Sequence, residues 1–293
     1  MAVVLKAVVF IPGLWLPAES WGTWSEHFWR AGYAPFAEPW PGMPPSAAEA
    51  RAHSEDLRIR GIAEIVEHYA AVLRSLRTRS IVVGHSLGGL VAQILLGKGL
   101  ASAAIAIDPA PMKGVLPLPF STLRSVLPVL RNPANRSRAV SLTAEEFRYG
   151  FGNAVSPRES DELYRRFAIP GPGRPLFQAA LANFTRRSEA AVDTGNGSRG
   201  PLLLLAGEKD HVVPPALTRA AARLYRRSGA VTDLRLVPGR GHSLTIDHGW
   251  REVADTALAW LAERSLSPPE LLSSSRRAAP LHGEAAACSS GGG

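Results

Sequence analysis

Cysteine is almost absent from this chain of 293 residues, in which Cys288 is the single one. One cysteine cannot build a disulfide framework, so a reducing compartment is compatible with the sequence. No apolar run approaches the roughly 20 residues that a membrane span needs. The apolar opening Met1–Phe10 lacks a basic start and an Ala-x-Ala cleavage site, which favours a first core strand over a signal peptide. We therefore expect a cytoplasmic protein without a membrane span.

Patterns that hold metals, phosphates or nucleic acids are lacking too. No cluster of His, Cys, Asp and Glu has metal-ligand spacing, and no glycine-rich loop matches a phosphate cradle, so we expect no metal and no cofactor. The net charge of +8 is scattered, without a basic stripe or interleaved aromatics, and supports neither nucleic acid nor an anionic membrane as a partner. Residues 111–199 hold thirteen Lys and Arg against seven Asp and Glu. This imbalance favours an Arg-rich solvated face and leaves open a mild preference for anionic substrates or surfaces.

The most informative stretch present is a turn within residues 79–92. Ile81–Val83 form an apolar run of strand length, and apolar residues recur at helical spacing from Leu87 onward. The change of period falls on Ser86, within Gly84-His85-Ser86-Leu87-Gly88. A strand-to-helix turn this sharp strains the serine backbone, and the two glycines remove side chains that would clash there. The pattern is typical of a nucleophile elbow.

Alternating strand and helix signals predict an α/β protein with a mostly parallel sheet covered by helices on both faces. We expect a core in residues 1–110 and 200–264. Residues 111–199 are rich in Pro, Gly and Arg and show helical fragments at 144–149, 159–167 and 176–185 without strand signals, which predicts an inserted helical cap. From Ser265 to Gly293 the composition shifts to Ser, Pro, Gly and Ala, which is typical of a disordered tail.

Two further polar residues follow strands of the expected sheet. Asp210 lies in the loop after the apolar run Leu202–Ala206, and His242 lies in the loop after Leu234–Val237. Sites in open parallel sheets assemble at the carboxyl ends of the strands, so both residues and Ser86 are expected at one edge. A serine needs a base and an orienting acid to become a nucleophile, and the chain order Ser, Asp, His is that of α/β-hydrolases.

The chain resembles α/β-hydrolase-fold serine hydrolases of the capped esterase and lipase type, over about residues 3–264. The resemblance implies that Ser86 is the nucleophile, that His242 is the base and then the acid, and that Asp210 orients the imidazole. It also implies that the 111–199 insertion is a lid over the site. It rests on three motifs: Gly84-His85-Ser86-Leu87-Gly88-Gly89, Gly207-x-x-Asp210-x-x-Val213-Pro214, and Gly241-His242.

The chain departs from the family at two points. Members commonly carry His-Gly after the first core strand, where this chain has Pro12-Gly13. The resemblance implies an oxyanion hole made of two backbone N–H groups, from Leu87 and, by position, from Leu14 in the altered loop. The antiparallel strands that often open the family's sheet also have no counterpart, so we expect a shortened version of the fold.

Several residues keep alternative interpretations. Asp108 also ends a strand and is a second candidate for the triad acid. His85 is expected to pack beside the elbow rather than to act in catalysis. Trp15 adjoins the oxyanion loop and could line an acyl pocket or simply belong to the core. Phe120, in the apolar stretch 117–130, is a second candidate for the pocket and indicates a moderately hydrophobic substrate.

The function expected from these observations is cofactor-independent hydrolysis of a carboxylic ester, lactone or related acyl bond in a small molecule. The same triad also serves C–C hydrolases, cofactor-free perhydrolases and hydroxynitrile lyases, and the same fold serves non-catalytic ligand receptors. A serine nucleophile argues against dehalogenase and epoxide hydrolase chemistry, which the family runs with a carboxylate. We expect a monomer or a small homo-oligomer.

Overall fold

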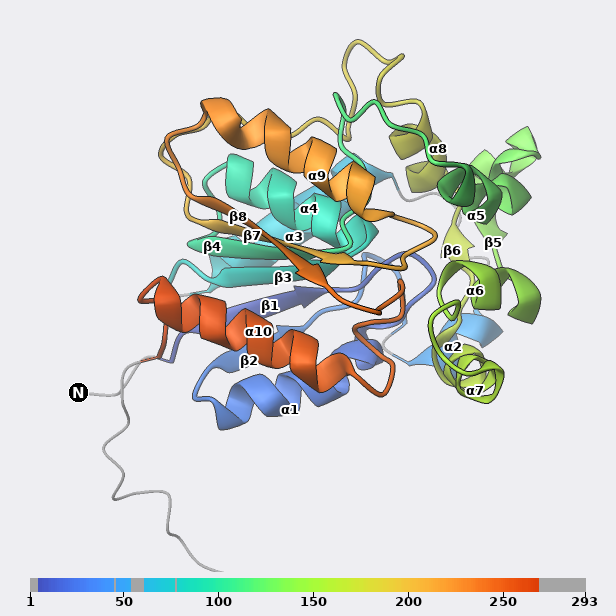
Figure 1. Ribbon diagram of the computed structural model, residues 1–293, viewed down its shortest axis with the longest axis horizontal. Helices are drawn as coiled ribbons and strands as arrows, with labels where there is room; N and C mark the ends of the chain where they lie inside the picture. The colour runs from blue at the N-terminus through green and yellow to red at the C-terminus, as the bar shows by residue number, and fades with distance from the viewer. Residues whose placement is uncertain (1–4, 45, 54–60, 77, 269–293) are drawn as a thin grey trace, which may run out of the picture.

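A six-stranded parallel sheet forms the centre of the computed structural model, which describes residues 5–44, 46–53, 61–76 and 78–268. The strand order is β2-β1-β3-β4-β7-β8 (Figure 1), so the chain runs outward from β1 to β2 and then crosses back to β3. This reversal creates a topological switch point between β1 and β3, the usual place for a ligand site in such sheets. The strands are β1 (Ala7–Ile11), β2 (Ala34–Ala37), β3 (Ile81–His85), β4 (Ala103–Ile107), β7 (Leu202–Gly207) and β8 (Thr232–Val237).

The four central strands are buried along their whole length, which explains their continuous apolar sequences. Successive residues of β1 enter opposite layers: Val8 and Phe10 belong to one hydrophobic cluster, and Val9 and Ile11 belong to the other. The edge strand β8 instead alternates between half-buried and exposed residues over its second half. Every ladder in this sheet is parallel, so the described chain contains the shortened fold expected from the sequence.

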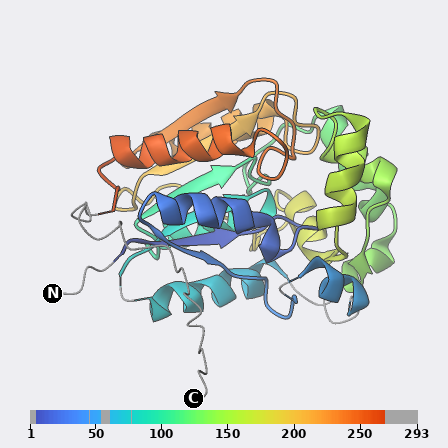
Figure 2. The same cartoon turned by 90° about the horizontal axis from the view of Figure 1, so that it is seen from below.

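Helices cover both faces of the sheet, as the alternating pattern predicts. Helices α1 (Gly22–Arg30) and α10 (Trp250–Glu263) pack side by side on one face, which Figure 2 views from below. Helices α3 (Ile62–Ser75), α4 (Leu87–Gly97) and α9 (Pro215–Leu224) cover the other face (Figure 1). Shorter elements lie in the connections: η1 (Ala18–Trp21), α2 (Ala47–Ala52) and η4 (Tyr225–Arg227).

Residues 111–199, which we call the cap segment, contain the helices that lie over the carboxyl ends of the strands (Figure 1). The last residues of the segment return to the opposite end of the sheet, where the Asn196 amide donates to the Gly97 carbonyl at the end of α4. They contain α5 (Phe120–Leu130), η3 (Pro133–Ser137), α6 (Ala144–Gly150), α7 (Pro157–Phe167) and α8 (Arg174–Ala180). The sequence of this segment shows no strand signals, yet β5 (Ala139–Val140) and β6 (Gly171–Pro172) form a short antiparallel pair beside the helices. Two-residue strands made partly of Gly and Pro carry no periodic signal, which is why the sequence does not reveal them.

Some boundaries differ from the expected ones for local reasons. Helix α7 starts at Pro157 rather than Glu159, because the Ser156 hydroxyl caps it by accepting a hydrogen bond from the Glu159 N–H at 3.2 Å. The expected tail begins at Ser265, yet Leu266 packs on the hydrophobic cluster that contains Val8 and Phe10. The Leu266 carbonyl also accepts a hydrogen bond from the Tyr33 hydroxyl. Most of the expected tail, residues 269–293, lies outside the described residues. Among the helices that are described, none is long and apolar enough to cross a membrane.

Trp24 of α1 connects the face of the sheet that α1 and α10 cover to the loop that follows β8. Its ring is fully buried against Phe10 and Phe28, and its indole N–H donates to the Thr245 carbonyl at 2.9 Å. We expect Trp24→Ala to lower the free energy of unfolding by about 3–5 kcal/mol, measured by urea denaturation, because it leaves a cavity. Trp29→Ala, on the solvent side of the same helix with 58% of the residue exposed, is the matched control and should cost under about 1 kcal/mol. Equal losses in the two variants would contradict this packing.

Candidate active site

Ser86 occupies the sharp turn between β3 and α4. Its backbone has φ 53° and ψ −118°, a strained conformation for a residue with a side chain. A Cβ atom on Gly84 would overlap the Gly88 carbonyl, and one on Gly88 would overlap the Ile11 carbonyl, so both positions require glycine. The Ser86 N–H donates to the Ile107 carbonyl at 2.9 Å, which fixes the turn against β4. The local geometry is the one that the sequence pattern predicts for an elbow.

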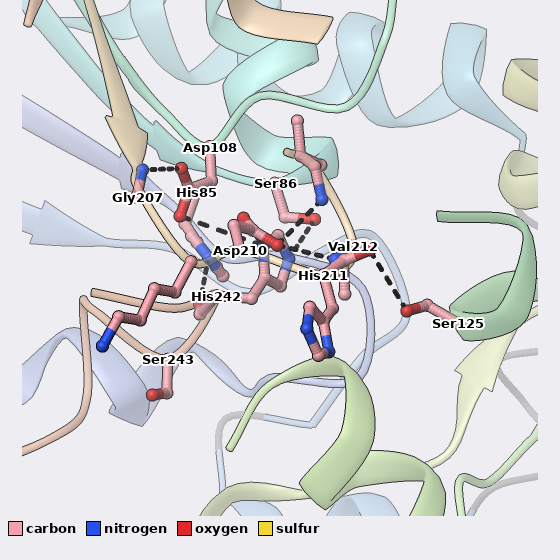
Figure 3. A network of polar contacts seen from close by, with 12 residues as sticks. His85, Ser86, Asp108, Ser125, Gly207, Asp210, His211, Val212, His242 and Ser243 are labelled. Carbon is pink, nitrogen blue, oxygen red and sulfur yellow. Dashed lines mark hydrogen bonds and ion pairs between the residues drawn. The ribbon is translucent and has the colours of Figure 1, made fainter. Parts of the chain in front are cut away.

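A chain of short contacts links Ser86 to His242 and Asp210 (Figure 3). The Ser86 Oγ lies 3.0 Å from the His242 Nε2, and the His242 Nδ1 lies 2.6 Å from the Asp210 Oδ2. The other carboxylate oxygen of Asp210 accepts the backbone N–H groups of Val212 and Val213 at 2.7 and 2.8 Å. His242 is fully buried, and only 8% of Ser86 is exposed. The structure thus brings together the three residues that the sequence singles out.

These contacts determine which imidazole nitrogen carries the proton. Asp210 can only accept, so the His242 Nδ1–H donates to it, and the Nε2 is left to accept the Ser86 hydroxyl proton. A charge-assisted hydrogen bond of 2.6 Å holds the ring in this orientation. The arrangement can therefore withdraw a proton from the serine hydroxyl and stabilise the imidazolium that results.

Asp108, the other candidate acid, lies beside this chain but does not complete it. Its Oδ1 accepts the Gly207 N–H at 2.7 Å, while its Oδ2 is 4.0 Å from the His242 Nδ1, beyond hydrogen-bond reach. Burial first, and the negative charge of Asp210 second, raise the pKa of the Asp108 carboxyl well above its ordinary value. Two adjacent buried carboxyl groups do not both ionise readily, so Asp108 is the neutral one of the pair.

His85 packs against His242 from the residue before Ser86. Its ring centroid is 4.6 Å from that of His242, and its Nε2–H donates to the His242 carbonyl at 3.0 Å. Burial, and then the neighbouring His242 imidazole, lower the pKa of His85 well below its usual value, so the ring stays neutral. Its role is to hold the backbone of the His242 loop.

His85, Asp108 and His242 place three donor atoms within 4.8 Å of one another, a grouping that could in principle ligate a metal. Both ring nitrogens of His242 are already engaged, by Ser86 and by Asp210, and the His85 Nε2 is engaged by a carbonyl. A cation here would have to break the short bond to Asp210. The contacts are therefore those of a hydrogen-bonded relay.

Residues 8–256 match the model of the alpha/beta hydrolase family. The chain belongs to the alpha/beta hydrolase family. Solved structures of similar fold include a monoacylglycerol lipase from Paleococcus ferrophilus, with a TM-score of 0.58, 20% identity and 89% of this chain and 97% of that one covered. They also include an esterase from Thermogutta terrifontis, with a TM-score of 0.63, 17% identity and 89% of this chain and 91% of that one covered. A methylesterase from Arabidopsis has a TM-score of 0.62 and 14% identity, with 88% of this chain and 100% of that one covered. A search of curated protein sequences finds no match.

The loop after β1 departs from the family's common His-Gly but still reaches the nucleophile elbow. A Cβ atom on Gly13 would lie 2.9 Å from the His85 Nδ1 and 3.1 Å from the Ser86 Cβ, so the loop backbone passes directly beside the serine. Leu14 is the next residue and is 3% exposed. Leu87 is the first residue of α4, where backbone N–H groups have no partner within the helix. Both expected donors thus flank Ser86.

Trp15 joins this loop to the cap segment. Its indole N–H donates to the Val140 carbonyl of β5 at 3.0 Å, and its own carbonyl accepts the Ile169 N–H. The ring packs edge-on against Phe151, which packs edge-on against His242. Trp15 is therefore 5% exposed and lies one aromatic ring away from His242.

The expectation for Phe120 needs correction, because this residue begins α5 and is 77% exposed. Helix α5 buries Thr122 and Val129, which share one helical face, and Phe120 projects from the opposite face. Its side chain points away from the buried cluster around Ser86. The apolar stretch of the cap that contains Phe120 faces solvent instead.

Sequence reasoning missed the residues that hold the His242 loop in place. The Ser243 N–H donates to the Phe151 carbonyl at 3.1 Å, and the Ser243 hydroxyl donates to the buried Asp247 at 2.8 Å. Asp247 also forms an ion pair with Arg240. Ser243 and Asp247 lie four residues apart on a turn and show no recognisable motif, and Phe151 comes from a distant part of the chain, so only the fold reveals them.

The neutral state of Asp108 has a measurable effect on stability. A buried acid with a raised pKa keeps its proton in the folded state, whereas the unfolded chain releases it above about pH 4, so stability falls as the pH rises from there. Asp108→Asn mimics the neutral acid and keeps the Gly207 contact. We expect the urea midpoint of the variant to equal that of the wild type at about pH 4 and to be higher than that of the wild type at about pH 8.

Asp108→Ala is the control, because it removes the acceptor of the Gly207 N–H and should destabilise the fold at both pH values. An Asp108→Asn variant that is less stable than the wild type only at the higher pH would show instead that Asp108 is ionised.

Proposed function

We propose that the protein is a serine hydrolase that cleaves a carboxylic ester or lactone through an acyl-enzyme on Ser86. The observation that carries the proposal is the continuous, buried Ser86–His242–Asp210 chain, with contacts of 3.0 and 2.6 Å. A structural serine has no need of an imidazole held in one tautomer by a buried carboxylate. The family membership and the esterase and lipase folds among its neighbours agree with this assignment.

In the first half-reaction, the Ser86 Oγ attacks the substrate carbonyl carbon while its proton passes to the His242 Nε2. The carbonyl oxygen becomes an oxyanion and accepts the backbone N–H groups of Leu87 and Leu14. One such donor is typically worth about a hundredfold or more in rate. The carbon–oxygen bond to the leaving group then breaks, and the imidazolium gives its proton to the departing alcohol oxygen. Asp210 accepts the His242 Nδ1–H throughout and stabilises the imidazolium.

In the second half-reaction, a water molecule gives a proton to the His242 Nε2 as its oxygen attacks the acyl carbon. The Ser86 Oγ leaves, takes that proton back from the imidazolium, and the carboxylic acid is released. The ring of Phe151 packs against His242, and the ring of Trp15 packs against Phe151, so aromatic side chains lie beside the triad. They favour a small, moderately hydrophobic acyl group. The burial of the site requires the substrate to enter beneath the cap segment.

Ser86→Ala is the direct test of the nucleophile. With p-nitrophenyl esters of increasing acyl length, we expect the variant to lose at least about 10⁴-fold in kcat/KM, because the triad acts as a unit. Its urea midpoint should stay close to that of the wild type, since alanine occupies the same turn. Turnover by purified Ser86→Ala at the wild-type rate would refute the proposal. Tight ester binding without turnover by the wild type would favour a ligand receptor.

The two neighbouring carboxyl groups provide a matched pair of variants for the triad acid. Asp210→Asn removes the charge that fixes the His242 tautomer and should lower kcat by about 10⁴-fold. Asp108→Asn removes a proton that the mechanism does not use and should keep kcat within about tenfold of the wild type. The measurement is kcat of both purified variants in stopped ester assays. A larger loss of kcat in Asp108→Asn than in Asp210→Asn would make Asp108 the triad acid.

A further inference from the structure

The cap segment presents an unusual concentration of exposed apolar side chains. Of the eleven large apolar residues exposed in the described part of the chain, seven lie in residues 116–127 and 181–184, which we call the cap face. Phe184 is 87% exposed and Leu116 is 78% exposed. The seven are Leu116, Leu118, Phe120, Leu123, Leu127, Leu181 and Phe184. Clusters of this kind mark interaction sites, whereas single exposed apolar residues need no explanation.

The two stretches of the cap face are bound to each other, so their apolar residues form one surface. The Gly114 N–H donates to the Asn183 side-chain oxygen at 2.7 Å, and the Asn183 amide donates to the Val115 carbonyl at 2.8 Å. The Lys113 Nζ donates to the carbonyls of Thr185 and Arg186, each at 2.8 Å. Helix α5, which carries most of the first stretch, packs against α8, which leads into the second (Figure 1).

Helix α5 is oriented so that this surface stays outward. Phe120, Leu123 and Leu127 recur at intervals of three and four residues and therefore share one face of the helix. The buried residues Thr122 and Val129 share the opposite face, which packs on the rest of the cap. An amphipathic helix normally buries its apolar stripe, and here that stripe is exposed.

The charges on the cap face have one sign. Residues 113–131 and 181–187 contain five cations and no Asp or Glu. Arg186 and Arg187 are exposed beside Phe184. Arg124 and Arg131 share a groove with Glu145 and Glu146 of α6, so part of their charge is offset. Arg187 shares a second groove with Glu189, so part of its charge is offset too, and Arg186 carries the exposed cationic charge nearest Phe184.

This combination fits an anionic lipid surface better than a second copy of the chain. A symmetric dimer would set each cap face against itself and bring the same cations together. A bilayer with anionic headgroups instead attracts the cations while the acyl boundary accepts the aromatic and leucine side chains. We propose that the cap face docks the protein on anionic membranes, as a peripheral contact that buries Leu118, Phe184 and their apolar neighbours.

The test measures partition of the full chain onto vesicles by co-sedimentation. The vesicles contain phosphatidylcholine alone or with about a third phosphatidylglycerol. We expect binding to the mixed vesicles only, weakening as salt rises. Arg186→Gln with Arg187→Gln should reduce the partition coefficient by up to about fivefold for each cation. Leu118→Ser with Phe184→Ser should reduce it by at least about tenfold.

Leu234→Ser with Leu236→Ser is the matched control, because these residues of β8 are exposed at 38% and 42% and lie outside the cap face. It should bind like the wild type. Three results would overturn the proposal. The control variant could lose binding as well, the wild type could bind equally with and without phosphatidylglycerol, or the cap-face variants could bind like the wild type. The proposal would also be overturned if the wild type did not bind vesicles and light scattering showed it to be a dimer, while the Leu118→Ser, Phe184→Ser variant was a monomer. Hydrolysis of a soluble ester by the Leu118→Ser, Phe184→Ser variant should be unchanged, which separates docking from catalysis.

Discussion

The close approach of the Ser86 turn to the end of β1 is the constraint on which the site depends. Gly88 lies so near the Ile11 carbonyl that no side chain fits, and the Ser86 backbone adopts φ 53° to make this contact. The elbow and the loop that carries Leu14 thereby meet at the switch point of the sheet. Strain at the serine is maintained by burial of β3 and α4, whose residues are all within the core. The fold stabilises a local geometry that the turn alone would not adopt.

A second constraint is electrostatic. The site contains two neighbouring buried carboxyl groups, Asp210 and Asp108, and they differ in their hydrogen-bond partners. Asp210 accepts two backbone N–H groups and the imidazole N–H, whereas Asp108 accepts one N–H and lies beside Asp210. Burial, and then the neighbouring Asp210, raise the pKa of the Asp108 carboxyl. The division of roles between the two residues follows from these hydrogen bonds rather than from their positions at strand ends.

The sequence predicted the sheet, the elbow and the convergence of Ser86, Asp210 and His242, because each follows from a period or a position at a strand end. It left Asp108 open, since two aspartates at neighbouring strand ends differ only in their partners. It placed Phe120 near the substrate, because an apolar stretch does not reveal which face of a helix turns inward. Contacts such as the Phe151 carbonyl to Ser243 join segments far apart in the chain and have no local signal. The sequence likewise does not reveal that residues 113–115 and 183–186 of the cap segment are hydrogen-bonded to each other.

Covalent labelling with a fluorophosphonate tests the central claim, an activated serine at position 86, most directly. Intact-mass spectrometry of the wild type, followed by peptide mapping, should show one adduct on the peptide that contains Ser86. The Ser86→Ala variant should show none, and Asp210→Asn should label much more slowly. A wild type that stays unmodified, or an adduct on another residue that persists in Ser86→Ala, would contradict the account.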